Sequence, residues 1–231
     1  LSILEHRLKR IIPILRNHNE SMHLHEIEND SELSISFTLE GKEGTRYAFK
    51  GKIDKLVLTE YKGKTYYTII DYKSGKESFI PENAFLGSSV QLPLYYYALK
   101  NVNLEEKSNA PFKAFLEESR FGGFGIQHVY ASSAKTFFKD DSSPLLTEEG
   151  VLAKTKLRGL FLDSKDYYTS FDVTSVDLEK DKFIAHGGTY LSKGKLFINE
   201  EKDCHDNFIL SQKDKKEKNF PLYNLHMLVN D

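Results

Sequence analysis

The spacing of apolar residues in the first part of the chain predicts one helix followed by a strand. From Leu1 to about Asn17, apolar side chains recur three or four residues apart, which is the spacing of one face of a helix. Pro13 lies within this stretch, and we expect it to kink or end the helix because proline removes a helix hydrogen bond. From Glu32 to Leu39 every second residue is apolar, which predicts a strand with one buried face.

A tight hairpin is predicted after this strand. Tyr47–Glu60 and Thr65–Lys73 have the composition of strands, and Lys62-Gly63 between them is typical of a two-residue turn. In the antiparallel pairing that such a turn sets, Asp54 lies opposite Asp71. Two carboxylates are therefore expected side by side on neighbouring strands.

The remaining sequence predicts shorter elements within a single domain. We expect a helix over Val90–Leu99, capped by Ser88 and with Pro93 in its first turn. Further elements are expected as strands at about residues 112–119 and 124–131, a loop at 139–150, and short pieces within Lys156–Phe161 and Phe183–Ile198. The sequence contains no internal repeat and no clear linker, so we expect one domain over residues 1–231.

Composition restricts the class of protein. The 231 residues are 39% hydrophobic and 29% charged, with a mean hydropathy of -0.48, which indicates a globular protein rather than a disordered chain or a membrane bundle. Cys204 is the single cysteine, which excludes an intrachain disulfide framework and any metal site built from several cysteines. We therefore expect a cytoplasmic protein with no membrane partner.

Charge is distributed unevenly along the chain. The net charge is -2, but residues 46–76 contain eight basic residues against three acidic ones. Clustered lysines can face the phosphates of a nucleic acid. They can equally form the solvated face of a hairpin, and the charge alone does not separate these two interpretations.

Three short motifs combine residue types that support metal-dependent chemistry. They are Gly51-Lys-Ile-Asp54, Ile69-Ile-Asp71-Tyr-Lys73 and Gln91-Leu-Pro-Leu-Tyr95. Carboxylates on neighbouring strands bind divalent cations through oxygen, which suits Mg²⁺ or Mn²⁺. Lys73, two residues after Asp71, shares its face and can orient a water or stabilise charge on a phosphate oxygen. Taken singly, an Asp-x-Lys pair on a strand is common, so the combination carries the argument.

In this order and spacing, these residues resemble the PD-(D/E)XK nuclease superfamily, and within it the nuclease domain of RecB- and AddB-type helicase–nucleases. The match runs over residues 46–100, and Leu157-Arg-Gly-Leu160 is similar to a later part of AddB-type domains. The resemblance implies an α/β, restriction-endonuclease-like core with a mixed central β-sheet flanked by α-helices. It also implies that the chain is one nuclease domain from a longer AddB- or RecB-like protein.

The resemblance implies roles for individual residues. Asp54, Asp71 and the backbone carbonyl of Tyr72 would bind the metal, and Lys73 would be the catalytic lysine. Glu32 is the candidate for a further upstream ligand, and Glu26 and Glu28 are its rivals. His6 on the first helix is one more candidate ligand. The alternative interpretation of His6 is a surface histidine.

The resemblance implies that the Gln91–Tyr95 motif contacts DNA and the catalytic groups. Gln91 and Tyr95 lie one helical turn apart and would face the site together. Tyr95 and its two successors also fit core packing, and we expect two of these three tyrosines to have that role alone. Lys52 and Lys76 are the basic residues expected to contact DNA.

The activity implied is that of a Mg²⁺- or Mn²⁺-dependent DNA exonuclease in recombination and double-strand-break repair. Its substrate would be single-stranded DNA or unwound duplex delivered by a helicase subunit or by a helicase domain of the same protein. Many AddB-type domains carry four cysteines that bind an iron–sulfur cluster, but Cys204 stands alone, so no cluster is expected in this segment. The alternatives are a catalytically inactive DNA-binding or scaffold domain and a phosphodiesterase acting on RNA or nucleotides.

Overall fold

The elements below come from a computed structural model that describes residues 3–24, 31–40, 44–75, 77–80, 83, 87–101, 110–129, 148–184, 187–192, 196–198 and 210–212. In chain order they are α1 (Ile3–Ser21), β1 (Ser31–Glu40), β2 (Arg46–Tyr61), β3 (Lys64–Lys73), α3 (Gln91–Asn101), α4 (Ala110–Glu118), β4 (Arg120–His128), α5 (Glu148–Thr155), β5 (Arg158–Phe161), α6 (Lys165–Phe171), a 3₁₀ turn η4 (Val173–Ser175), β6 (Val176–Asp177), β7 (Lys182–Phe183), β8 (Leu196–Ile198) and β9 (Leu210–Gln212).

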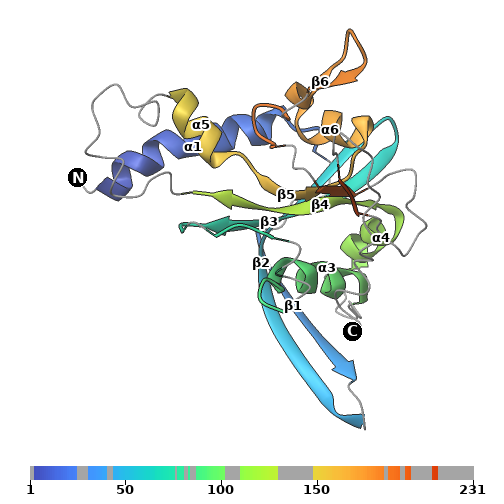
Figure 1. Cartoon of the computed structure of the whole chain (residues 1–231). Helices are drawn as coiled ribbons and strands as arrows, with labels where there is room; N and C mark the ends of the chain where they lie inside the picture. The colour runs from blue at the N-terminus through green and yellow to red at the C-terminus, as the bar shows by residue number, and fades with distance from the viewer. Residues whose placement is uncertain are drawn as a thin grey trace.

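A mixed five-stranded sheet with helices on both sides forms the centre of the molecule (Figure 1). The strand order is β1-β2-β3-β4-β5, and β3 and β4 are parallel whereas the other neighbours are antiparallel. Helices α3 and α4 lie on one side, and α1, α5 and α6 lie on the other (Figure 1). This arrangement confirms the predicted α/β fold with a mixed sheet flanked by helices.

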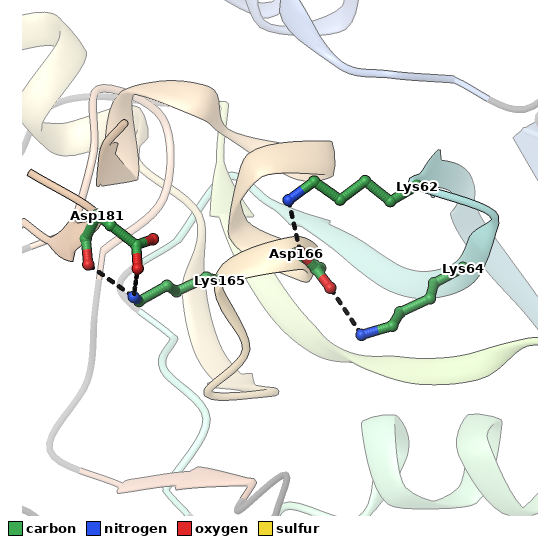
Figure 2. Close-up of polar contacts among 5 residues, drawn as sticks. All are labelled: Lys62, Lys64, Lys165, Asp166 and Asp181. Carbon is green, nitrogen blue, oxygen red and sulfur yellow. Dashed lines mark hydrogen bonds and ion pairs between the residues drawn. The ribbon is translucent and has the colours of Figure 1, made fainter. Parts of the chain in front are cut away.

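The β2–β3 hairpin has the predicted turn and register. Lys62 and Gly63 both have positive φ, 52° and 72°, as a type I′ turn requires. The pairs run from Tyr61–Lys64 to Lys55–Ile70, so Asp54 and Asp71 come next. Asp166 on α6 holds the turn by pairing with Lys62 and Lys64 (Figure 2).

Residues after β3 differ from the prediction. The predicted strand at 112–119 is wrong, because Ala110–Glu118 is the helix α4, with Phe115 buried against the sheet. Pro111 suits the first turn of a helix, where its missing N–H is not needed. Together α3 and α4 form the crossover that a parallel pair of strands needs, which explains why β4 runs parallel to β3.

Two predicted helix boundaries are also wrong. Helix α1 continues through Pro13 to Ser21, since Pro13 is on the exposed side while Ile11 and Ile14 pack against Val151 of α5. Ser88 does not cap α3: its hydroxyl donates to the Asn83 carbonyl, and the helix begins at Gln91. Proline at the third helical position leaves this start intact.

Some predicted features lie outside the described residues. They are Glu26, Glu28, Lys76, Cys204 and the loop up to residue 147. Within the ranges that are described, no helix combines the length and the apolar character needed to cross a membrane.

Candidate active site

The site forms where strands β2 and β3 stop pairing with each other. Their last ladder pair is Lys55–Ile70. One residue before Lys55 on β2, the Oδ2 atom of Asp54 accepts a hydrogen bond of 2.8 Å from the backbone N–H of Tyr72. A side-chain carboxylate therefore takes the place of a backbone partner, and this bond fixes Asp54 beside Asp71.

Asp71 is a buried carboxylate with a separate partner for each oxygen. It follows the fully buried pair Ile69 and Ile70, and only 2% of its surface is exposed. Its Oδ1 accepts a hydrogen bond of 3.1 Å from Gln91 Nε2, and its Oδ2 lies 2.9 Å from Lys73 Nζ. Burial raises the pKa of Asp71, and the hydrogen bond and charge of Lys73 oppose that rise.

Lys73 lies among three acceptors at the rim of the site. Its side chain is 24% exposed, and Nζ donates to Gln91 Oε1 at 3.1 Å as well as pairing with Asp71. Glu77 Oε2 lies 3.7 Å away. Burial on its own lowers the pKa of Lys73, but the hydrogen bond to Asp71 and the charges of Asp71, Glu77 and Asp54 raise it above its usual value. The amine is therefore held as a cation.

Gln91 joins the strand residues to helix α3. Its Nε2 donates to Asp71 Oδ1 and, at 2.9 Å, to the hydroxyl of Tyr95, while its Oε1 accepts from Lys73. Both amide hydrogens and the amide oxygen are used, so the side chain has one orientation that satisfies all three partners. The first turn of α3 thus supplies the predicted pair one turn apart, and Gln91 links this turn to Asp71 and Lys73.

Glu32 and Lys52 lie close to this cluster on β1 and β2. The ladder pairs Ser31 with Lys55 and Leu33 with Ile53, which places Glu32 opposite Asp54. Glu32 has a positive φ of 63°, and its carboxylate, 72% exposed, pairs with Lys52 Nζ at 2.7 Å. The two side chains therefore hold each other beside the site.

The remaining candidate residues are placed less closely. His6 lies in the first half of α1, and its side chain falls outside the described part of the chain, as do Lys76, Glu26 and Glu28. Glu77 is a neighbour of Lys73 that sequence reasoning missed. It follows the end of β3, where strand alternation no longer gives a signal.

The donor atoms at the site suit a small, hard divalent cation. Asp54 and Asp71 offer carboxylate oxygens, and Mg²⁺ is commonly held by one or two carboxylates while it keeps several waters. Across the described ranges, no three acidic, histidine or cysteine side chains come together as a metal-binding group. A cation here would therefore need oxygen ligands besides these carboxylates, such as a main-chain carbonyl, water or a phosphate.

Comparison with known protein families agrees with this geometry. The family model described as the PD-(D/E)XK nuclease superfamily matches residues 2–148. The chain belongs to this superfamily. The match contains the Asp54, Asp71 and Lys73 cluster and the helix that carries Gln91, so the resemblance based on these motifs is confirmed.

This PD-(D/E)XK chain is also similar to curated relatives that are named as one subunit of an ATP-dependent helicase/deoxyribonuclease. The relative from Levilactobacillus brevis is 29% identical over 158 residues, which are 65% of this chain and 13% of the relative. The relative from Clostridium acetobutylicum is 29% identical over 131 residues, 56% of this chain and 10% of the relative. The chain therefore spans only a small part of the length of these relatives.

Proposed function

We propose that this chain is a metal-dependent DNA nuclease domain that hydrolyses phosphodiester bonds. The observation that carries the proposal is the cluster at the open end of the β2–β3 ladder. There a buried carboxylate, Asp71, is held between the amine of Lys73 and the amide of Gln91, with Asp54 beside it. Two carboxylates beside an amine and an amide offer oxygen ligands for a divalent cation and hydrogen-bond donors for a phosphate, which supports a binding site here.

Asp54 and Asp71 are the proposed ligands of Mg²⁺ or Mn²⁺, together with the backbone carbonyl of Tyr72. Glu32 and His6 remain the proposed additional ligands. When bound, the ion would act as a Lewis acid on the scissile phosphate and lower the pKa of the attacking water. The amine of Lys73 orients that water or donates to the phosphate oxygen on which negative charge develops. Gln91 keeps Lys73 and Asp71 at a fixed separation while this occurs.

DNA contacts are proposed on the surface next to the cluster. The β1–β2 hairpin extends beyond the rest of the sheet, past α3 (Figure 1). Lys50 and Lys52 are exposed on β2, four and two residues before Asp54, where they can meet the phosphates of a bound strand. Lys76, Gln91 and Tyr95 are the other proposed DNA contacts.

The proposed context is a helicase–nuclease that works in DNA recombination and double-strand-break repair. The relatives' name describes part of a helicase and deoxyribonuclease, and we propose that residues 1–231 act as one domain of such a protein. A helicase subunit, or a helicase domain in the same protein, would deliver single-stranded or unwound DNA to an exonuclease of this kind. The proposed location is the cytoplasm.

Cleavage of labelled DNA tests the proposed activity. The purified chain is incubated with linear single-stranded, linear double-stranded and circular single-stranded DNA in Mg²⁺, Mn²⁺ or EDTA, beside Asp71→Asn. Asparagine keeps the shape of the side chain but removes its charge. We expect cleavage of linear DNA with metal only and none by the variant, with circles resistant if the enzyme needs an end.

Three results would contradict the proposal. Cleavage that persists in EDTA would show that the reaction needs no metal. Equal cleavage by Asp71→Asn would show that the proposed site does not carry out the reaction. A chain that binds DNA but leaves every substrate intact with either metal would favour the scaffold alternative.

A further inference from the structure

Gly51 on β2 lies against the ring of Tyr95 on helix α3. A methyl group added at Gly51 would lie 3.1 Å from Cε1 of Tyr95 and 3.6 Å from Cγ1 of Ile35. Carbon atoms prefer to be about 3.5–4.0 Å apart. Any side chain at Gly51 would therefore push the Tyr95 ring away by a few tenths of an ångström or more.

Tyr95 is held on two sides, so such a displacement would act on its neighbours. Its ring is half-buried and packs against the main core, and its hydroxyl accepts the hydrogen bond from Gln91 Nε2 at 2.9 Å. A shift of the ring would move the hydroxyl. Gln91 would then have to follow it or lose the bond.

Gln91 connects Tyr95 to Asp71 and Lys73, so a shift of Tyr95 would reach both of them. The hydrogen that does not bond to Tyr95 bonds to Asp71, and the amide oxygen accepts from Lys73. Rotation of the amide by even a small angle would lengthen one of these contacts. Tyr95 thus fixes the amide, and the amide fixes the separation of Asp71 and Lys73.

We propose that Gly51 is a positioning residue for the active site, acting through Tyr95 on Gln91. Its missing side chain lets the Tyr95 ring lie against β2, and this contact sets the orientation of the Gln91 amide between Asp71 and Lys73. The inference rests on the proposed nuclease function for its consequence in catalysis. The contact itself can be tested without activity.

The chain offers a sharp structural readout because it contains only three glutamines, at positions 91, 127 and 212. Labelling of glutamine side chains with ¹⁵N gives three amide signals, and Gln91→Glu identifies the signal of Gln91. Gln127 is buried on β4 and donates to the Thr155 carbonyl, so its signal reports on the sheet. Gly75→Ala is the matched control, since a methyl there meets only Glu77 Oε1 at 3.6 Å.

We expect Gly51→Ala to shift the Gln91 signal in the same direction as Tyr95→Phe and to leave the Gln127 signal in place. An unshifted Gln91 signal in Gly51→Ala would overturn the proposal. If Gly51→Ala does not fold, the proposal predicts that Gly51→Ala combined with Tyr95→Ala does, because the ring that causes the clash is gone. Failure of that double variant to fold beside a folded Tyr95→Ala would equally overturn it.

Kinetics then test the consequence for cleavage. Gly51→Ala is expected to lower kcat roughly tenfold, because the Gln91 amide no longer holds Asp71 and Lys73 in place. In a Tyr95→Phe background the same change should cost no further activity, since Tyr95 no longer holds Gln91. If Gly51→Ala lowers kcat by the same factor in both backgrounds, Gly51 does not act through Tyr95 and the proposal is overturned. Absence of cleavage by the unmodified chain would contradict the nuclease function but leave the amide test of Gly51 decisive.

Discussion

Asp71 and Lys73 depend on each other for their charge states. Burial disfavours the ionised form of Asp71 and raises its pKa, whereas the nearby ammonium of Lys73 favours the ionised form and opposes this rise. The same pair holds the pKa of Lys73 above its usual value. Lys73 therefore starts as a cation, suited to stabilising negative charge on a phosphate.

Replacement of Lys73 separates its catalytic role from metal binding. Lys73→Met keeps the apolar stem but removes the charge, and we expect cleavage to fall roughly 100-fold or more because charge on the phosphate loses its stabiliser. Binding of Mn²⁺, measured by calorimetry, should persist through Asp54 and Asp71. A cleavage rate within twofold of the unmodified chain would show that Lys73 is not catalytic.

The placement of the candidate residues was predictable because they lie in short motifs of fixed spacing. Asp54 lies beside Asp71, with Lys73 two residues on, because of the hairpin register that the turn at Lys62-Gly63 determines. Their roles come from the family resemblance and stay predictions. The contacts of Gln91 with Asp71 and Lys73 were not predictable, since they depend on how α3 packs against β3. Spacing along one helix places Gln91 beside Tyr95 but does not say what lies opposite.

At the scale of elements, the strands were easier to predict than the helices. Alternation in β1 and β2 and the turn before β3 are local signals. Helix α4 has neighbouring apolar residues that fit either a strand or a helix, and the parallel crossover that selects the helix is a long-range feature. The short helix α6 lies within a run of buried aromatic residues, which gives no polar face to mark its period.

Helix α1 is joined to α6 by a buried histidine. His18 is 2% exposed, its Nε2 lies 3.1 Å from the Phe171 carbonyl, and its ring stacks on Tyr190 at 4.5 Å. Burial lowers the pKa of His18 to about 4, although the charge of Asp172 and the Phe171 carbonyl act in the opposite direction. The ring is therefore neutral at pH 7 in the folded protein.

This histidine makes stability depend on pH. Between pH 6.5 and pH 4 the unfolded chain binds a proton at His18 that the folded chain does not, so stability is present above this window and is lost as the pH falls through it. The full loss is roughly 3 kcal/mol. Urea unfolding at pH 7 and pH 5 should show a smaller decrease for His18→Gln than for the unmodified chain. Equal decreases would contradict a buried neutral His18.

At the scale of the whole molecule, the cluster joins the open end of the β2–β3 ladder to the first turn of α3. The β1–β2 hairpin extends past α3 (Figure 1). The proposed path of a DNA strand runs along the exposed lysines of β2, Lys50 and Lys52. The net charge of -2 gives no general attraction for DNA, so the local charge near the site must provide it.

Salt dependence tests the proposed contact with Lys52. Each phosphate contact to single-stranded DNA contributes about 0.7 to the slope of log affinity against log salt. Lys52→Gln should therefore weaken binding, measured by fluorescence anisotropy in Ca²⁺ to suppress cleavage, and reduce the slope by about that amount. Lys154→Gln, at an exposed lysine on α5, is the matched control. Equal slopes for the Lys52 variant and the control would show that Lys52 does not contact a phosphate of the DNA.

The open end of the β2–β3 ladder is the proposed binding site of the metal used in cleavage. Crystals grown with Mn²⁺ and measured at an anomalous wavelength locate the ion directly, with Asp71→Asn as the control. We expect one strong anomalous peak within coordination distance of both the Asp54 and Asp71 carboxylates, and its loss in the variant. No peak there at saturating Mn²⁺, or a peak that Asp71→Asn leaves unchanged, would contradict the claim.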